Sequence, residues 1–229
     1  APVGAASFFS GRFNGLNHAI SSLTINRPTA AYAGLFAETR GEVRDVRFEG
    51  GSVSGLGFVG VLAGMTSGAI TRVSSTTAVS NVQMPNTYPS ALGGLIGFVN
   101  GGSVSHCVSS GSVTAINGGD DVGGVAGFNR FAVNGCYSTA NVSGGSTVGG
   151  VVGYMQSGSI SNSYASGSVT GTQYVGGLLG FNDSTVSTSY STATVTGPAG
   201  QAGALVGFNR ATLSNNYWNA ALSGLTGSV

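Results

Sequence analysis

The apolar positions of this chain recur in short, evenly spaced groups, and the sequence around them repeats. A block that reads Val-Gly-Gly-Leu-x-Gly-Phe, or a close variant of it, occurs seven times. The intervals between blocks are nearly constant, apart from two wider ones after the second and third blocks. The seven blocks begin at Tyr32, Val59, Leu92, Val122, Val148, Val175 and Ala202. A regular period of this kind predicts a repeat architecture in which each unit is one small supersecondary element.

Two further aliphatic positions follow each block at nearly constant distances. The nearer set lies close to the middle of each unit: Val43, Ile70, Val104, Val133, Ile160, Val186 and Leu213. The farther set lies towards the end of each unit: Val53, Val79, Val113, Val142, Val169, Val195 and Leu222. Each unit therefore contains three short β-branched segments separated by Gly, Asn and Ser, which predicts strands and no helix.

Three short strands cannot close a hydrophobic core by themselves, so the units must stack and bury their inward residues against their neighbours. Crossovers between parallel strands strongly favour one hand. We therefore expect an all-β fold, a right-handed three-sided parallel β-helix (β-solenoid) of about eight coils. Residues 1–31 are expected to form an N-terminal entry coil or cap, and residues 32–229 the seven repeats of one β-helix.

The composition is unusual for a globular domain and narrows the classes of partner. Charged residues make up 7% of the chain, there are 41 Gly, and 41% of the residues are apolar, which argues against disorder. All eight basic residues are Arg and the net charge is +1, so nucleic acid is not an expected partner. The sequence has no apolar run long enough to cross a bilayer, so membrane insertion is not expected.

Glycine pairs within the block suggest how the coils turn, and aromatic residues suggest what covers the faces of the coils. Adjacent glycines such as Gly93 and Gly94 permit either positive φ or a close approach of successive coils. Stacking should also align aromatic side chains in two rows. One row is Phe98, Phe128, Tyr154, Phe181 and Phe208; the other is Tyr137, Tyr164, Tyr190 and Tyr217. The second row serves either as part of the wall or as an outward platform on which sugars stack.

These units resemble the GLUG motif family, whose Gly-Leu-x-Gly signature is present at Gly177-Leu178-Leu179-Gly180. The resemblance covers residues 32–229. It implies a structural or adhesive β-solenoid segment of a larger bacterial cell-surface or secreted protein, flanked by further domains of the same polypeptide. In that family such arrays occur in filamentous-haemagglutinin-like adhesins exported by two-partner secretion, and beside catalytic domains of secreted enzymes. The resemblance therefore implies an extracellular or cell-surface location.

Candidate catalytic residues are sparse. Histidine occurs only at His18 and His106, and no spacing suggests a nucleophile with its base, so we expect no enzyme activity, no cofactor and no metal. The adjacent carboxylates Asp120 and Asp121 are read as turn residues, with a calcium site as the alternative. Two other functions stay open: a carbohydrate-binding module of a secreted enzyme, and a carbohydrate-active β-helix.

The second and third units are longer than the others, and their extra residues follow the third strand in both. We expect the two insertions to emerge from the same corner of adjacent coils. They would form a patch that binds a glycan or protein receptor, because loops on rigid scaffolds often carry recognition. A tolerated insertion without function is the alternative. The candidate patch consists of Asn81, Gln83, Met84, Asn86, Tyr88, Asp120 and Asp121.

Two cysteines, Cys107 and Cys136, occupy equivalent positions in consecutive units. Neighbouring parallel strands lie about 4.8 Å apart, a separation that a disulfide accepts. An oxidising extracellular compartment favours the bridge, so we expect a disulfide between them. The alternative is a pair of buried thiols, because strands in register direct both Cβ atoms the same way.

Overall fold

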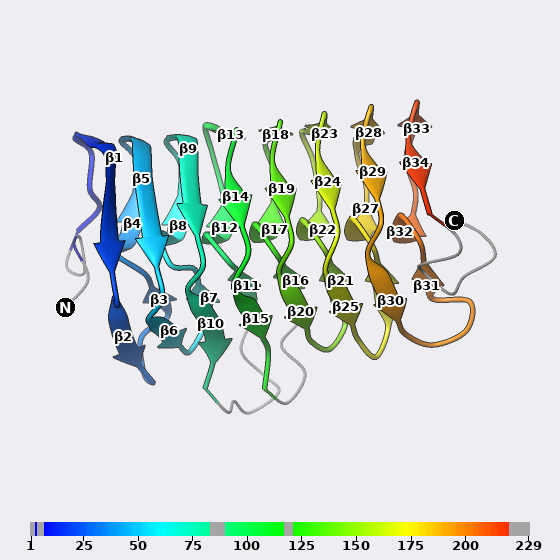
Figure 1. Cartoon of the computed structure of the whole chain (residues 1–229), viewed down its shortest axis with the longest axis horizontal. Helices are drawn as coiled ribbons and strands as arrows, with labels where there is room; N and C mark the ends of the chain where they lie inside the picture. Colours follow the sequence, from blue (N-terminus) through cyan, green and yellow to red (C-terminus); the bar gives the residue numbers. More distant parts are fainter. Residues whose placement is uncertain (1–2, 4–6, 83–89, 117–120, 220–229) are drawn as a thin grey trace.

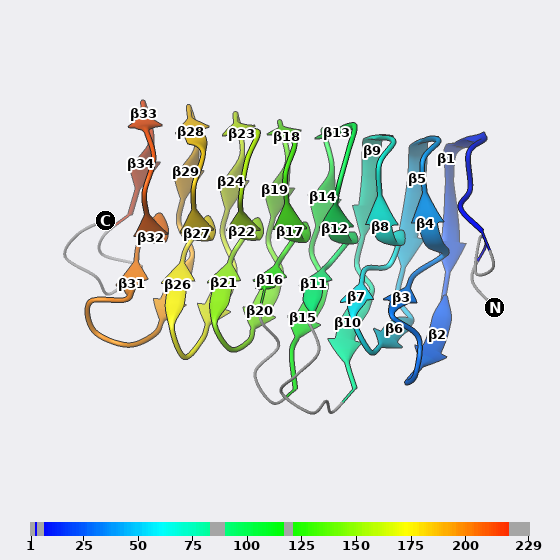
Figure 2. The same ribbon diagram turned by 180° about the vertical axis from the view of Figure 1, so that it is seen from behind.

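The chain forms a rod of stacked coils in the computed structural model, which describes residues 3, 7–82, 90–116 and 121–219. Figures 1 and 2 show the coils side by side along the rod, with the first strand, β1, and the last, β34, at opposite ends. The strands form four parallel sheets, three of them with seven strands each, so the fold is a parallel β-solenoid of about seven turns. No helix in the described ranges is long and apolar enough to span a membrane.

We name the sheets A to D; the chain passes through them in the order D, A, B, C in each coil. Sheet D contains β3 (Tyr32–Ala33), β7 (Phe58–Val59), β11 (Ala91–Gly93), β16 (Asp121–Gly123), β21 (Thr147–Gly149), β26 (Tyr174–Gly176) and β31 (Ala202–Gly203). Sheet A contains β4 (Phe36–Thr39), β8 (Ala63–Thr66), β12 (Ile96–Val99), β17 (Ala126–Asn129), β22 (Val152–Met155), β27 (Leu179–Asn182) and β32 (Val206–Asn209).

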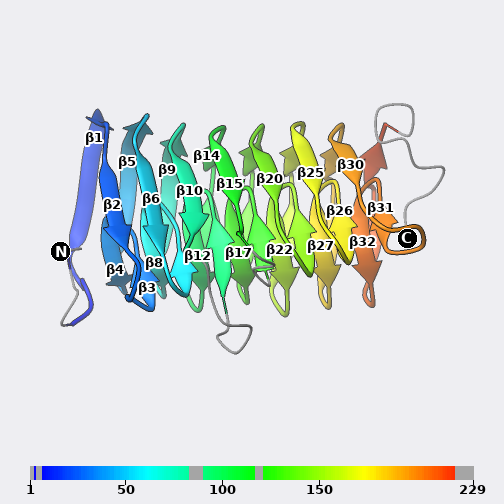
Figure 3. The ribbon, with the colours of Figure 1, turned by 90° about the horizontal axis from the view of Figure 1, so that it is seen from below.

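Sheet C lies in one row across the rod when it is seen from below (Figure 3). It contains β2 (Thr24–Arg27), β6 (Ser52–Gly55), β10 (Ala78–Asn81), β15 (Ser112–Thr114), β20 (Asn141–Ser143), β25 (Ser168–Thr170) and β30 (Thr194–Thr196). The entry coil contributes to this sheet through β2, which pairs with β6.

Sheet B has 13 strands because it divides in two after the third coil. Its undivided strands are β1 (Arg12–Ser21), β5 (Glu42–Glu49) and β9 (Ala69–Ser75). One branch contains β13 (Ser103–Ser105), β18 (Ala132–Asn134), β23 (Ser159–Ser161), β28 (Thr185–Ser187) and β33 (Leu213–Ser214). The other contains β14 (Val108–Ser109), β19 (Tyr137–Ser138), β24 (Tyr164–Ala165), β29 (Tyr190–Ser191) and β34 (Tyr217–Trp218).

A column of residues in the left-handed conformation marks where sheet B divides. The column begins with Asp45 at φ 56° and continues through Arg72, His106, Gly135, Asn162, Thr188 and Asn215, with φ between 49° and 62°. Such a residue interrupts the alternation of inward and outward side chains, so that the residue after it points into the rod. Only one of the seven is Gly, although this conformation costs other residue types about 1–2 kcal/mol.

The predicted apolar positions form or border the core, apart from Leu222, which lies outside the described residues. Val104 pairs with Val133, and Val113 pairs with Val142, as the repeat alignment requires. These valines and their equivalents in neighbouring coils are buried, and they belong to one continuous hydrophobic cluster. The alignment was wrong by one residue at the first block, where Ala33 and not Tyr32 pairs with Val59. The bend after Ala33 is one residue shorter than the others, so the block starts later.

The solenoid has four sheets where three sides were predicted, because the repeated block bends in its middle. Its first residues form sheet D and its last residues form sheet A, with the two glycines at the bend. Neither Gly123 nor Gly124 has positive φ, so the need for glycine is a matter of space. A Cβ on Gly124 would overlap the Ser138 hydroxyl across the core and the carbonyl oxygen of Gly150 in the next coil. The close-approach interpretation of the glycine pairs is therefore the correct one.

The substitution Gly124→Ala tests this constraint. We expect it to lower the free energy of unfolding by about 1–3 kcal/mol, because the added methyl group must displace backbone as well as a side chain. The matched control is Ala204→Gly, at the same position of the last block, where no described coil lies beyond it to be overlapped. The control should cost at most about 1 kcal/mol from chain entropy. Urea unfolding followed by circular dichroism measures both; equal losses would contradict the explanation.

Candidate binding surfaces

The described ends of the two insertions lie next to each other on the rod. The strands that precede them, β10 and β15, pair through Val79 and Val113. The strands that follow them, β11 and β16, pair through Ala91 and Asp121. Both insertions thus leave and rejoin the solenoid at neighbouring points. A contact between Tyr88 and Asp120 stays a prediction, because these two residues, like Gln83, Met84 and Asn86, lie outside the described residues.

Asn81 joins the bases of the two insertions. It ends β10 with 2% of its surface exposed, and its Oδ1 accepts a hydrogen bond of 2.6 Å from the backbone N–H of Ile116. That N–H belongs to the start of the second insertion. Asn81 therefore clamps one loop base to the other from inside, and the prediction that it belongs to an exposed binding patch is wrong for this side chain.

Asp121 lies at the start of β16 and is half-buried. Its carboxylate accepts a hydrogen bond from the hydroxyl of Thr147, the equivalent residue in the next coil. Its charge also contributes to raising the pKa of Tyr154 on sheet A. Asp121 thus lies on the surface where the outer faces of sheets D and A meet. A binding site that includes Asp121 would lie on that surface.

The predicted tyrosine row is present on the outside of sheet B. The rings of Tyr137 and Tyr164 stack with centroids 4.7 Å apart and an interplanar angle of 2°, and those of Tyr164 and Tyr190 with 4.8 Å and 4°. Ring faces therefore point along the rod and cover one another, while the edges point outward. A sugar stacks on a ring face, so the middle of this row is a poor platform for sugars, and its packing favours a structural role.

The other predicted row lies on the outside of sheet A. Its rings are half-buried, and successive centroids from Phe98 to Phe208 are 4.9–5.1 Å apart. Tyr174 of sheet D extends the row sideways, 5.3 Å from Phe181 and 4.9 Å from Phe208. We call this surface the aromatic face. It consists of Phe98, Phe128, Tyr154, Phe181, Phe208 and Tyr174.

A row of polar residues follows the aromatic face along the same coils. We call it the polar row; its members are Asn100, Arg130, Gln156, Asp183 and Arg210. Each donates its backbone N–H to the preceding coil in the same way, which fixes their alignment. This row was not predicted from the sequence, because its members share a position and not a residue type. The signal was their constant place, the second position after each aromatic residue of sheet A.

The two arginines of the polar row lie over the aromatic rings. The guanidinium carbon of Arg130 is 5.2 Å from the Phe98 ring centroid and 5.3 Å from that of Phe128. The guanidinium carbon of Arg210 is 4.9 Å and 5.3 Å from the centroids of Phe181 and Phe208. These distances suit cation–π contact, which holds the planar groups close to the rings. Their remaining donors face solvent, since 62% of the Arg210 side chain is exposed.

Hydrogen bonds link the polar row into a continuous surface. Arg130 Nε donates to Gln156 Oε1 at 2.6 Å, and its Nη1 donates to Asn100 Oδ1 at 3.1 Å. The hydroxyl of Tyr154 donates to Asp183 Oδ2 at 2.8 Å. Burial, the hydrogen bond to Asp183 and the nearby carboxylate charges raise the pKa of Tyr154, so its phenol stays protonated and continues to donate.

The cysteines belong to a polar column inside the rod, formed by the residues that follow the left-handed positions from His106 onward. In this column the backbone N–H of Cys107 donates to Cys136 Sγ at 3.4 Å, and that of Cys136 donates to Ser163 Oγ at 3.2 Å. The pattern continues with Ser163 to Ser189 and Ser189 to Asn216. The left-handed residue removes each of these N–H groups from the sheet ladder, and a side chain of the next coil satisfies it instead.

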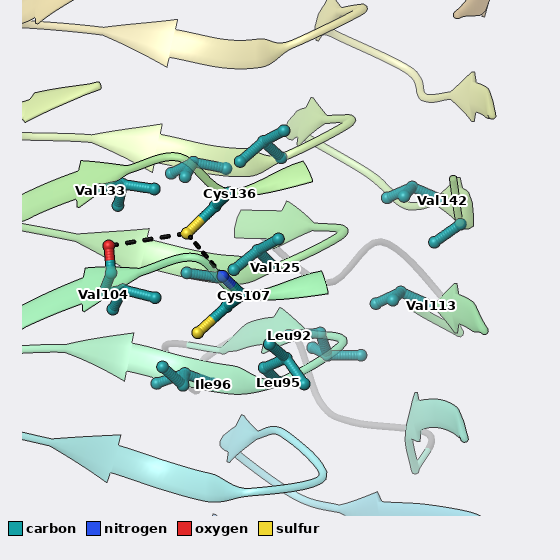
Figure 4. Close-up of a cluster of buried hydrophobic side chains, with 14 of the residues drawn as sticks. Leu92, Leu95, Ile96, Val104, Cys107, Val113, Val125, Val133, Cys136 and Val142 are labelled. Atoms are coloured by element: carbon teal, nitrogen blue, oxygen red, sulfur yellow. Dashed lines mark hydrogen bonds between the residues drawn. The ribbon is translucent and has the colours of Figure 1, made fainter. Parts of the chain in front are cut away.

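Both thiols are free, so the predicted disulfide between Cys107 and Cys136 is not formed. Figure 4 shows the two sulfur atoms pointing in the same direction, and Cys136 Sγ accepts a hydrogen bond from the backbone N–H of Cys107. Burial raises the pKa of the Cys107 thiol well above its ordinary value, and the thiol donates to the Ser105 carbonyl at 3.2 Å. Oxidation requires a thiolate, which burial disfavours at Cys107.

The charged residues of β5 pair mainly with one another and with adjacent coils. Arg72 of β9 binds Asp45 of β5 through two hydrogen bonds, of 2.6 Å and 3.0 Å. The hydrogen bond to Arg72 and the positive charges of Arg72 and Arg44 hold the pKa of Asp45 below its ordinary value. These groups are exposed, so their pairing adds little stability.

The described residues contain no group of three His, Cys, Asp or Glu side chains that could hold a metal ion. A cavity of about 370 Å³ lies at the N-terminal end, lined by Leu23, Ile25 and Leu35 among others. In the part of the chain that the structure describes, no full coil precedes these inward-facing residues. The cavity is therefore the open end of the solenoid interior.

Comparisons with known proteins agree with this architecture. Residues 88–114, 144–170 and 171–196 match the GLUG motif. A stretch of 91 residues, 39% of this chain, is 37% identical to halomucin of Haloquadratum walsbyi, strain DSM 16790 / HBSQ001, and spans 1% of that protein. The repeat thus also occurs within a far larger polypeptide.

A solved structure of similar fold is that of a proposed immunoglobulin A1 protease from Bacteroides ovatus. The TM-score is 0.61 at 22% sequence identity, and the match covers 95% of this chain. It covers 63% of the Bacteroides chain, less than two thirds of it. At this identity the likeness shows the fold alone, and it supports the parallel β-solenoid.

Alkylation tests the state of the cysteines. In the native protein iodoacetamide should add nothing, because both side chains are buried. After unfolding without reductant it should add two alkyl groups, read by intact mass. An unfolded protein that takes up no label and weighs two hydrogens less would show the disulfide instead.

Substitutions of Ser163 test the polar column. Ser163→Ala should lower the free energy of unfolding by about 1–3 kcal/mol, because it leaves the N–H of Cys136 buried without an acceptor. Ser163→Cys, the residue found in the two preceding coils, should restore most of that loss. Denaturant unfolding of both variants provides the measurement; equal destabilisation would mean that volume and not hydrogen bonding matters at this position.

Proposed function

Because the chain is a β-solenoid that contains GLUG motif repeats, we propose that it is a rigid adhesive segment of a larger secreted or cell-surface polypeptide. It acts by binding a glycan or protein receptor and not by catalysis. The observation that supports this most is the register: equivalent residues pair from coil to coil along the described rod. Solenoids use such extended, regular faces for binding.

Two further observations support the proposal. The 91 residues similar to halomucin make up 1% of that protein, so an array of this kind can be a small part of a long polypeptide. A rod with a continuous hydrophobic core undergoes no large internal motion. Its surface groups therefore stay at fixed distances from one another. That property suits a segment that holds a binding surface away from its point of attachment.

The second candidate is a carbohydrate-binding module of a secreted enzyme. The aromatic face favours it, since rings flanked by Arg, Asn, Gln and Asp are a common composition of sugar-binding surfaces. Both candidates require this chain to bind its ligand without turnover. They differ in what lies elsewhere in the polypeptide.

The test uses the whole chain immobilised on a sensor surface. The probes are purified neutral polysaccharides, acidic polysaccharides and extracellular-matrix proteins. We expect at least one probe to be retained, with no new reducing ends after prolonged incubation with the polysaccharides. Reducing ends that increase in proportion to protein concentration would replace the proposal with a carbohydrate-active enzyme, and a surface that retains no probe would overturn it.

A further inference from the structure

We infer that the aromatic face and the polar row together bind a neutral, extended polysaccharide that runs parallel to the rod. This inference rests on the proposed function and names the class of ligand. The surface extends over the coils from Phe98 to Arg210 and includes Asp121 and Thr147 at the junction with sheet D.

The spacing of the rings suits a polymer of sugars. Each coil presents one ring, and successive centroids are 4.9–5.1 Å apart. A sugar ring in an extended β-linked chain advances by a similar length, so successive sugars meet equivalent surroundings. The apolar C–H faces of sugars pack against aromatic rings, and an array of such contacts gains affinity with length.

The polar row supplies the hydrogen bonds that hydroxyl groups require. Arg130 and Gln156 are exposed planar groups that are already held in place by each other, so little side-chain entropy is lost on binding. Arg210 and Asp183 form a second such pair at 3.8 Å, and Tyr154 holds Asp183 from the other side. A row of preorganised donors and acceptors beside the rings matches a ligand that carries hydroxyl groups along the edge facing the row.

The balance of charge selects a neutral ligand. Arg130 and Arg210 contribute two positive charges to this surface, and Asp121 and Asp183 contribute two negative ones. A polyanion would gain from the arginines but would be repelled by the carboxylates interspersed with them. In a neutral glycan both kinds of group find hydroxyl partners.

The tyrosine row does not compete for this role. Its ring faces are covered by neighbouring rings at 4.7–4.8 Å, whereas the rings of sheet A meet mostly edge to face, at 67–75° for the first three pairs. Edge-to-face packing leaves part of a ring face directed outward. Tyr190 therefore offers a matched control, an exposed aromatic residue on another side of the rod.

The experiment is affinity electrophoresis of the full chain in gels that contain hydroxyethyl cellulose, galactomannan or, as the acidic probe, polygalacturonate. The test variant is Arg130→Ala/Arg210→Ala, which removes exposed groups and leaves the aromatic rings in place. We expect the dissociation constant for at least one neutral polysaccharide to rise tenfold or more. Tyr154→Phe, which removes only the hydroxyl, should show a smaller rise. The controls Arg72→Ala and Tyr190→Ala should bind as the unaltered chain does, and thermal unfolding should show that every variant is folded at the temperature of the gel.

Other outcomes separate this inference from the proposed function. Retardation by a neutral polysaccharide that Tyr190→Ala abolishes and the double variant does not would overturn the inference while the adhesive function stands. Binding of the unaltered chain to polygalacturonate or to matrix proteins only would do the same. If the double variant unfolds, Tyr154→Phe and Gln156→Ala give the result, and unchanged binding in both overturns the inference. If the unaltered chain binds none of the probes, both proposals are overturned.

Discussion

Parallel hydrogen bonding in register between successive coils is the interaction on which every other feature of this rod depends. Once Val104 pairs with Val133 in one coil and with Ile70 in the other direction, each side chain lies beside its equivalents. Inward positions become columns and outward positions become rows. The residue types at one outward position of the repeat therefore determine the chemistry of one row of the surface along the described rod.

The same interaction explains what the sequence could predict. Val and Ile at fixed distances after each block identified the inward columns, and the alignment of Phe and Tyr identified both aromatic rows, because these depend only on the period. The fourth sheet was missed because a glycine pair is equally compatible with a straight strand and with a bend; only the structure shows that the residues before and after the pair belong to separate sheets. The predicted disulfide was wrong because the oxidising compartment was given more weight than the common direction that strands in register impose on the two side chains.

The candidate site was harder to predict than the fold for a related reason. Binding groups vary from coil to coil, so repetition does not reveal them: Asn100, Gln156 and Asp183 share a place and differ in chemistry. Asn81 showed the opposite error, a polar residue beside an insertion that satisfies a backbone N–H from inside. The bend between sheets D and A then brings Tyr174 and Asp121 to the edge of the aromatic face, although they lie in strands that the sequence did not separate.

The polar column inside sheet B has a consequence for how such a protein changes over generations. Cys136, Ser163 and Ser189 each accept a hydrogen bond from the coil before, and each donates to a carbonyl within its own coil. Each of these side chains can therefore accept the hydrogen bond of the backbone N–H in the coil before it, whichever of the three residues that coil carries. Recombination that removes or duplicates one of these coils thus leaves every N–H of this column with an acceptor and changes the length of the rod by about 4.8 Å. The length of the segment can therefore change from one generation to the next in steps of one coil, without a change in what its surfaces bind.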